Sequence, residues 1–485
     1  WTVDDPDDFL VIENILNHFA PDLDFSWKDV LQLKKTHPDY FEANKSIKRN
    51  AGAALGTGQK LWNRAKKIIP GGNMLLSKRA EMFLPDQWPA YFSKAKGCHV
   101  WDMDGNKYTD MSIMGIGTNI LGYGHPEVDE AVLKIMSEAS FINGPSVRSL
   151  QANLESYLGV KHVIPCANGT DALQVALMAL NLKPGDEVIT TSFTFIATAE
   201  VIALLNLTPV LVDVEADTFN INPKAVEAAI TDKTKAIIPV HLFGQCSDMH
   251  AINEIAEKNN LYVIEDTAQA IGADFKCPES GEIKKAGTIG HIGCTSFFPS
   301  KNLGAYGDGG AIFTNDDELA EKMRVVVNHG MKIRYYHDEV GINSRLDSIQ
   351  AAILDIKLRY LDEYGKARQE AANFYNRAFS NCTKITTPKI SDFTTHVFHQ
   401  YTLVLNDIDR EGLMKHLAEK GIASAIYYPV PLHLQKAYLD PRYNEGDFPV
   451  TEMLSKLVMS LPIHTELTPE IQKEITEAVL EFVEK

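Results

Sequence analysis

From about Leu150 onward, short β-branched runs alternate with amphipathic stretches, and this alternation constrains the fold more than any other feature of the chain. The run HVIPC is followed by DALQVALMALNL, then DEVITTSFTF, then ATAEVIALLNL, then TPVLVDV. This order is typical of β-α-β units, whose strands pair in parallel. Further apolar runs at 235–240 and 261–264 add buried strands. The sequence therefore predicts an α/β fold with a mainly parallel, helix-covered sheet, and functional loops at the carboxyl ends of its strands.

Regions on both sides of this pattern indicate further units, because 485 residues exceed what one hydrophobic core usually supports. The charged stretch 363–379 predicts a long connecting helix, and HQYTLVLN with DREGLMKHLAEKG predicts a smaller α/β domain after it. Near the amino terminus, 2–37 is predicted helical, and Asp104-Gly105 predicts a tight turn between two strands. The expected units are 1–48, 49–140, a large domain at 141–379 and a small C-terminal domain at 380–485.

Charge and cysteine use exclude several classes of protein. The formal net charge of -17 disfavours binding to nucleic acid or an anionic membrane, since both require a cationic surface. The six cysteines form no CxxC pair and no disulfide framework, so we predict neither a structural metal nor disulfides. The acidic start and the lack of a long apolar run predict neither export nor a membrane span, and the cytoplasm fits best.

Two motifs together supply what a pyridoxal 5′-phosphate (PLP) enzyme requires of its protein: VIEDTAQAIGA at 263–273 and CTSFFPSKNLGAYGDGGA at 294–311. PLP needs a lysine that forms a Schiff base and an acid that keeps its ring nitrogen protonated. Asp266 follows an apolar strand, and Lys301 lies in a loop with aromatic neighbours, so these two residues are the candidates. Taken singly, Asp266 could be a helix N-cap and Lys301 a solvated loop lysine.

A third motif, CANGTDALQVALMAL at 166–180, has the form strand, turn and helix. The free N–H groups at a helix N-terminus bind phosphate readily. Gly169 allows close approach of the backbone, and Thr170 can donate its hydroxyl. The alternative interpretation is an ordinary Thr or Asp N-cap.

The segment from about Phe141 to the C-terminus resembles the DegT family of sugar nucleotide aminotransferases. The resemblance rests on the three motifs above and on others, among them NGP, GDEVITTSFTFIATAE, TKAIIPVHLFGQ, GINSRLDSIQAA and YYPVPLHLQ. It implies the fold type I architecture of PLP-dependent transferases, PLP as cofactor, and a homodimer.

The resemblance also implies a role for individual residues around the cofactor ring. Lys301 would be the Schiff-base lysine and proton shuttle, and Asp266 the partner of the pyridine nitrogen. Gln269 would form a hydrogen bond with the phenolic oxygen of the cofactor, and the cofactor ring would lie between Phe195 and Ala268. Gln269 could otherwise be a helix-surface residue, and Phe195 a core aromatic residue.

The family pattern assigns two further groups of residues. The cofactor phosphate would be held by Gly169, Thr170, Ser296 and, from the second subunit, Asn343. Ser296 and Asn343 could equally be ordinary loop residues. Motifs that resemble the substrate-facing walls of the family contain His241, His329, Tyr427, Tyr428 and His433.

The reaction implied by the resemblance moves an amino group from glutamate to a nucleotide-linked keto sugar, for cell-surface polysaccharide synthesis. CANGTDALQ, SFFPSK and YGDGGA are most similar to enzymes that aminate the 3-keto position of a UDP-linked N-acetyl hexuronic acid. A 4-keto-6-deoxy sugar is the nearest alternative substrate. A PLP-binding regulator without turnover remains a second reading, whereas dehydration is disfavoured because position 301 is lysine.

The first 140 residues depart from the family. Residues 61–136 resemble the N-terminal segment of class III aminotransferases of the glutamate-1-semialdehyde aminomutase kind, but the class III phosphate motif does not follow. Residues 1–45 resemble the C-terminal tail of a nucleotide-sugar cytidylyltransferase, without its nucleotide loop. We expect a fused or truncated remnant, with a plain appendage as the alternative.

Overall fold

A computed structural model describes residues 6–21, 25–41, 56–69, 72, 89–110 and 121–484 of the chain. Its contacts form two compact units: 1–94 with 100–108, and 95–99 with 109–485. The expected segment 49–140 contributes residues to both units, so the four domain boundaries stay a prediction.

The first unit contains the predicted N-terminal helices: α1 (Pro6–Phe19) and α2 (Trp27–Thr36), followed by the 3-10 turn η1 (Pro38–Phe41) and by α4 (Thr57–Ile68). Apolar side chains of α1, α2 and η1 pack in a small core of Val11, Ile15, Val30, Leu33 and Phe41. Asp104 caps α4, since its carboxylate accepts hydrogen bonds from the backbone nitrogen and hydroxyl of Thr57.

The predicted tight turn at Asp104-Gly105 is confirmed. It joins β2 (His99–Asp102) to β3 (Lys107–Thr109), and β1 (Phe92–Lys96) completes a three-stranded sheet in the order β1-β2-β3. Gly105 has a φ of +86°, a conformation that favours glycine.

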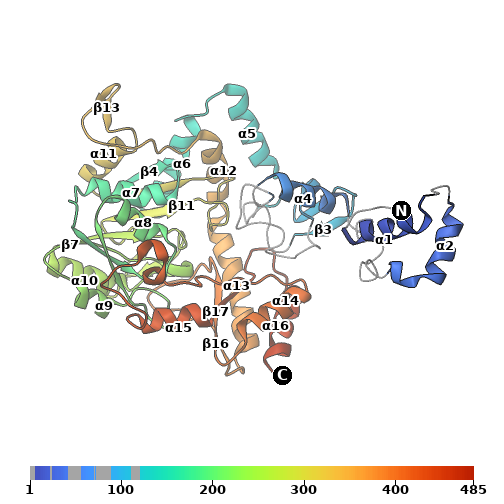
Figure 1. The fold of residues 1–485 in the computed structure, drawn as a ribbon. Coiled ribbons are helices and arrows are strands. Elements are labelled where there is room, and N and C mark those ends of the chain that lie inside the picture. Colours follow the sequence, from blue (N-terminus) through green and yellow to red (C-terminus); the bar gives the residue numbers. More distant parts are fainter. Residues whose placement is uncertain are drawn as a thin grey trace. The chain divides into compact units, whose positions relative to one another are not determined.

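A seven-stranded sheet in the order β4-β12-β11-β8-β7-β5-β6 forms the centre of the second unit (Figure 1). Neighbouring strands pair in parallel, except that β12 is antiparallel to β11 and to β4. The predicted mainly parallel sheet is therefore confirmed. Its strands are β4 (His162–Cys166), β5 (Glu187–Thr191), β6 (Thr208–Val212), β7 (Thr234–Ile238), β8 (Tyr262–Asp266), β11 (Ile292–Ser296) and β12 (Gly310–Thr314).

Alternating side chains place two apolar layers on the faces of this sheet. Within β8, Ile264 belongs to the core under one set of helices and Val263 to the core under another. The helices α7 (Gly169–Ala179), α8 (Ala197–Leu204) and α11 (Asp317–Val326) cover the Ile264 face. The opposite face packs against α6 (Pro145–Leu158) and α12 (Ser348–Leu358) at the β4 side, and against α9 (Pro223–Ala229) and α10 (Met249–Asn259) at the β7 side.

The C-terminal part has a hydrophobic core of its own. The predicted connecting helix is α13 (Leu361–Phe379), and the predicted strand and helix after it are β16 (Tyr401–Leu405) and α14 (Arg410–Glu419). β16 pairs antiparallel with β15 (Ile385–Thr386) and β17 (Val458–Leu461).

The α-helices of the second unit not yet named are α5 (Pro126–Glu138), α15 (Pro449–Leu457) and α16 (Pro469–Val483). Two short antiparallel strand pairs complete this unit: β9 (Asp274–Lys276) with β10 (Ile283–Lys285), and β13 (Met331–Ile333) with β14 (Tyr336–His337).

All six cysteines lie within the described ranges and are free thiols. Within the described ranges, none of the helices combines the length and apolar character that a bilayer-spanning segment requires.

Candidate active site

The strand register brings the separate motifs of the sequence to one edge of the sheet. Cys294 of β11 pairs with Asp266, the last residue of β8. Ser296 ends β11 and pairs with Gly310 of β12, which in turn pairs with Cys166 at the end of β4. The ends of β8, β11 and β4 therefore meet at the carboxyl edge, as the β-α-β pattern predicts.

Asp266 lies at the strand end where the sequence places it and is only 7% exposed. One carboxylate oxygen accepts a hydrogen bond from the Thr198 hydroxyl at 2.8 Å, and the other accepts from the backbone nitrogen of Ala268 at 3.1 Å. The two donors fix the orientation of the carboxylate. No helix begins here, so the alternative reading of Asp266 as a helix N-cap does not apply. Thr198 was not predicted, because its segment indicates only an apolar helix.

The N-terminus of α7 faces Ser296. A Cβ atom on Gly169 would lie 2.6 Å from Cβ of Ser296, so only glycine fits there. The N-cap is Asn168, whose side chain accepts from the backbone nitrogen of Asp171, and not a Thr or Asp as in the alternative interpretation. The N–H groups of Gly169 and Thr170 belong to the first turn, which has no acceptors within a helix. This geometry fits a phosphate group.

Lys301 is half-buried in the loop that follows β11. Its backbone nitrogen donates to the Phe298 carbonyl at 2.8 Å. Asn302, the next residue, is buried and donates from its side chain to the Val397 carbonyl at 3.0 Å. The segment that carries Lys301 is therefore a folded loop with fixed neighbours.

Gln269 is buried and its amide orientation is fixed by two hydrogen bonds. The side-chain oxygen accepts from the backbone nitrogen of Phe243 at 2.8 Å, and the side-chain nitrogen donates to the Tyr428 hydroxyl at 3.0 Å. The alternative reading of Gln269 as a helix-surface residue is thus wrong, since it is 4% exposed. One N–H of its amide group is not used by Tyr428.

Phe195 is 54% exposed, so it is not a core aromatic residue. Phe193, two positions earlier, has that role and is fully buried. The rings of Phe195 and Tyr428 lie 6.4 Å apart, and Ala268 is half-buried on the segment after Asp266. The fold thus keeps an exposed aromatic face near Gln269, as stacking on a planar ligand requires.

Two of the histidines predicted to face the substrate lie in the interior. His241 is fully buried: one ring nitrogen lies 2.8 Å from the Glu265 carboxylate, and the other accepts from the Ser247 backbone nitrogen. His433 is 1% exposed, and its ring nitrogens contact Ser192 at 2.8 Å and Glu452 at 3.2 Å. Desolvation lowers the pKa of His433. With both ring nitrogens engaged in the interior, the two histidines have the contacts of core residues, and their substrate role stays a prediction.

Three other predicted residues remain accessible. His329 and Asn343 are exposed and lie on paired segments, since the His329 backbone nitrogen donates to the Ile342 carbonyl at 3.0 Å. Tyr427 is half-buried next to Tyr428, and burial raises the pKa of both hydroxyls. Their roles stay predictions.

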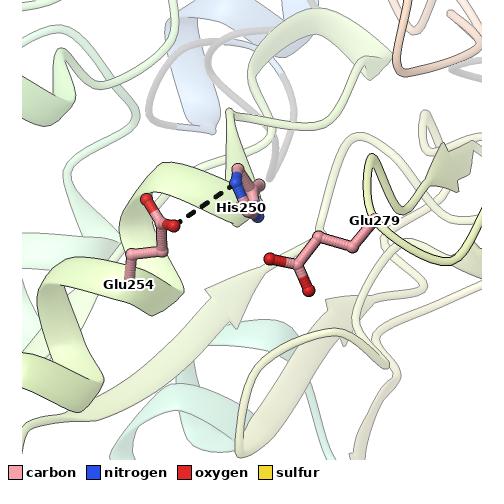
Figure 2. Close-up of side chains that lie close together, drawn as sticks. All are labelled: His250, Glu254 and Glu279. Atoms are coloured by element: carbon pink, nitrogen blue, oxygen red, sulfur yellow. Dashed lines mark ion pairs between the residues drawn. The ribbon is translucent and has the colours of Figure 1, made fainter.

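One group of described side chains has ligand types suited to a metal ion (Figure 2). His250 and Glu254 lie one turn apart on α10, and Glu279 comes from the turn between β9 and β10. The imidazole and the Glu254 carboxylate already form an ion pair at 3.5 Å, and both glutamates are exposed. None of the three belongs to the motifs at the carboxyl edge, so we treat the group as a surface ion pair.

Comparison with known proteins agrees with this arrangement. Residues 124–480 match the model of the DegT/DnrJ/EryC1/StrS aminotransferase family. The chain is 49% identical over 359 residues to "Pleiotropic regulatory protein" of Geobacillus stearothermophilus, which covers 74% of this chain and 94% of that protein. It is 46% identical over 341 residues to "UDP-2-acetamido-2-deoxy-3-oxo-D-glucuronate aminotransferase" of Pseudomonas aeruginosa, covering 70% and 92% of the two chains.

Among solved structures, a DegT DnrJ EryC1 StrS aminotransferase from Brucella abortus is similar, with a TM-score of 0.70 and 42% identity. The similarity covers 74% of this chain and 96% of that one. The family match includes the Asp266, Gly169 and Lys301 motifs and spans most of the second compact unit. The chain therefore belongs to the DegT/DnrJ/EryC1/StrS aminotransferase family.

Proposed function

We propose that the chain is a PLP-dependent aminotransferase that transfers an amino group to a keto sugar carried by a nucleotide. One observation carries the proposal: Asp266, the Gly169–Ser296 contact and the Lys301 loop all lie at or directly after strand ends at one edge of the sheet. An acid, a phosphate cradle and a lysine are the groups that PLP requires, and PLP supplies the electron-accepting ring.

Each residue then has a specific task. Asp266, held by Thr198 and Ala268, would keep a proton on the ring nitrogen. The first turn of α7 and the Ser296 hydroxyl would bind the phosphate, and Gln269 would donate the N–H that Tyr428 does not use to the phenolic oxygen. Lys301 would hold the cofactor and move a proton to and from the substrate carbon.

For the substrate, we propose a UDP-linked 3-keto N-acetyl hexuronic acid with glutamate as donor, in the synthesis of a cell-surface polysaccharide in the cytoplasm. The motif similarity and the activity named for the Pseudomonas aeruginosa relative support this choice. A 4-keto-6-deoxy nucleotide sugar is the alternative. Incubation of the loaded protein with each sugar and glutamate, followed by mass spectrometry of the amine product, distinguishes the two.

The cofactor assignment has its own experiment. Purified protein incubated with PLP should absorb visible light, and borohydride followed by peptide mass spectrometry should find the cofactor fixed to Lys301. Lys301→Ala should abolish both results and turnover. Cofactor fixed to another lysine, or turnover in Lys301→Ala, contradicts the proposal.

A regulator that binds PLP without turnover is the second candidate, because a 49% identical relative carries a regulatory name. In that case glutamate would leave the visible absorbance unchanged. As an aminotransferase, the protein should lose that absorbance when glutamate is added and regain it with a keto acid.

We further propose a homodimer in which Asn343 of each subunit completes the phosphate site of the other. Asn343 is exposed, and the segment before it contains the exposed side chains of Ile333, Tyr335, Tyr336 and Val340. Mixing Lys301→Ala with Asn343→Ala subunits should restore up to about a quarter of the wild-type activity, because half of the dimers are mixed and contain one intact site. No recovery despite subunit exchange contradicts the shared site.

The residues before 141 form a separate proposal, although the family match begins at residue 124. We propose that 1–48 and 49–140 are remnants related to a cytidylyltransferase tail and a class III N-terminal segment, without a part in catalysis. Trp62 is buried within the first unit, so Trp62→Ala should lower the folding stability of that unit. Turnover and cofactor absorbance should stay at the wild-type level, and a loss of either contradicts the idea of a remnant.

A further inference from the structure

Lys357 is a fully buried lysine in α12 that contacts the loop carrying Lys301. Its amino group donates a hydrogen bond to the Gly304 carbonyl at 2.6 Å. The same nitrogen lies 4.7 Å from the centre of the Tyr306 ring. Both contacts fall within a few residues of Lys301, inside the motif at 294–311.

The loop is folded so that Gly304 lies against the backbone of Lys301. A Cβ atom on Gly304 would be 2.3 Å from the Pro299 carbonyl oxygen and 3.1 Å from that of Lys301. The Lys301 backbone nitrogen donates to Phe298 at 2.8 Å. A group that fixes the Gly304 carbonyl therefore also fixes the backbone from which the Lys301 side chain extends.

A second side chain of α12 holds the same loop. Gln350 accepts a hydrogen bond from the backbone nitrogen of Tyr306 at 2.8 Å and lies about two helical turns before Lys357. Between them, Ile353 and Leu354 are buried and hold α12 in the core. The helix thus presents two polar contacts to the loop from a rigid position.

Packing alone does not explain a lysine at this place. Burial lowers the pKa of the Lys357 amino group to about 7, which means that the interior penalises its charged form. A methionine or leucine would fill a similar volume without this penalty. The amino group therefore has a polar task, and the Gly304 carbonyl is the partner that the geometry provides.

We propose that Lys357 is a positioning residue for Lys301: by holding the Gly304 carbonyl, it fixes the loop at 297–306 and with it the Lys301 amine at the carboxyl edge. The proposal rests on the proposed function, in which Lys301 carries the cofactor. Lys357 itself touches neither cofactor nor substrate.

The first experiment needs no cofactor and measures amide hydrogen exchange of the full chain. In Lys357→Met, the peptide covering 297–306 should exchange up to about tenfold faster, while the β8 peptide keeps its wild-type rate. Lys357→Arg, which retains donors, should restore most of the protection. Leu417→Ala removes a buried side chain of the C-terminal core and serves as a control that destabilises the protein without a change confined to the loop.

Equal loop exchange in Lys357→Met and wild type overturns the proposal, as does a loss of protection spread evenly over the sheet. If Lys357→Met yields no soluble protein, Lys357→Gln takes its place, and the same loop-specific increase is required of it.

The second experiment follows the fixing of PLP to Lys301 by borohydride at several pH values. In Lys357→Met, the displacement of Lys301 should shift the pH midpoint of the visible absorbance relative to the wild type. It should also lower kcat about tenfold, with KM for glutamate changed less than about threefold. A wild-type protein that never fixes PLP to Lys301 defeats the proposed function. A wild-type protein that does so, together with a Lys357→Met variant that matches it in midpoint and kcat, defeats only the role of Lys357.

Discussion

The side-chain nitrogen of Gln269 donates a hydrogen bond to the hydroxyl of Tyr428 across 3.0 Å, although the two residues lie 159 positions apart in the chain. The opposite end of the Gln269 amide accepts from the Phe243 backbone. The residue proposed to contact the phenolic oxygen of PLP is thus oriented from two sides, one of which is the segment after α14.

Tyr428→Phe removes the acceptor for Gln269 and leaves the ring in place. A buried amide without one partner costs about 1–3 kcal/mol, so kcat should fall about tenfold or more while PLP still binds. The position of the visible absorbance maximum should shift as well, because Gln269 is free to turn. Tyr401→Phe is the control: its hydroxyl donates to Asn376 in the C-terminal core, and its loss should change neither quantity. A Tyr428→Phe protein with wild-type spectrum and rate would disprove the role of this contact.

Thr198→Val tests the second orienting contact. Valine has the shape of threonine but cannot donate to the Asp266 carboxylate, which then has one donor fewer in a buried site. We expect kcat to fall about 10- to 100-fold, corresponding to about 1–3 kcal/mol, with little change in melting temperature. Steady-state kinetics and a thermal melt decide this. A drop in melting temperature with unchanged kcat would show that Thr198 only supports packing.

Gly169→Ala tests the phosphate cradle. The added methyl group would overlap Cβ of Ser296, so the turn must shift and PLP affinity should fall about tenfold or more. Gly365→Ala, within α13, is a matched control. The nearest side-chain atom to its added methyl group would belong to Val397, at an ordinary contact distance of 3.8 Å. That change should stabilise the helix by up to about 1 kcal/mol and leave PLP binding unchanged. Titration of both variants with PLP, followed by absorbance, makes the comparison.

The β-α-β alternation predicted the sheet and the carboxyl edge, because strands buried on both faces, such as TPVLV and TKAII, consist mostly of apolar residues. Asp266 was predictable for the same reason: a carboxylate directly after a buried strand has few places to lie other than that edge. The Asp104-Gly105 turn followed from the backbone requirement of glycine.

Contacts between distant segments were beyond the sequence. His241 and His433 lie in motifs that resemble the substrate-facing walls of the family. In the structure each forms a hydrogen bond in the interior, with Glu265 and Glu452 respectively, and no local sequence pattern indicates such a pairing. Thr198 and Lys357 look like ordinary helix residues in the sequence, since their partners lie 68 and 53 positions away. Only the folded chain brings these groups together.

His396 gives the C-terminal part of the structure a predictable sensitivity to acid. Burial lowers the pKa of this histidine to about 3, and its ring accepts a hydrogen bond from the Phe398 backbone nitrogen at 2.9 Å. The His396 ring binds a proton near pH 6.5 in the unfolded chain but only near pH 3 in the folded chain. The contribution of neutral His396 to the free energy of unfolding is therefore fully present above pH 6.5 and declines as the pH falls toward 3. At pH 5 the loss of folding free energy is about 2 kcal/mol.

His396→Asn keeps an acceptor for Phe398 but cannot titrate, so its free energy of unfolding should fall about 2 kcal/mol less than that of the wild type between pH 7.5 and 5. Urea unfolding at both pH values measures the difference. Val397→Ala, a neighbouring buried change without a titrating group, should lose stability equally at the two pH values and retain the acid sensitivity of the wild type. If His396→Asn and wild type lose the same free energy between the two pH values, His396 isn't the source of the sensitivity.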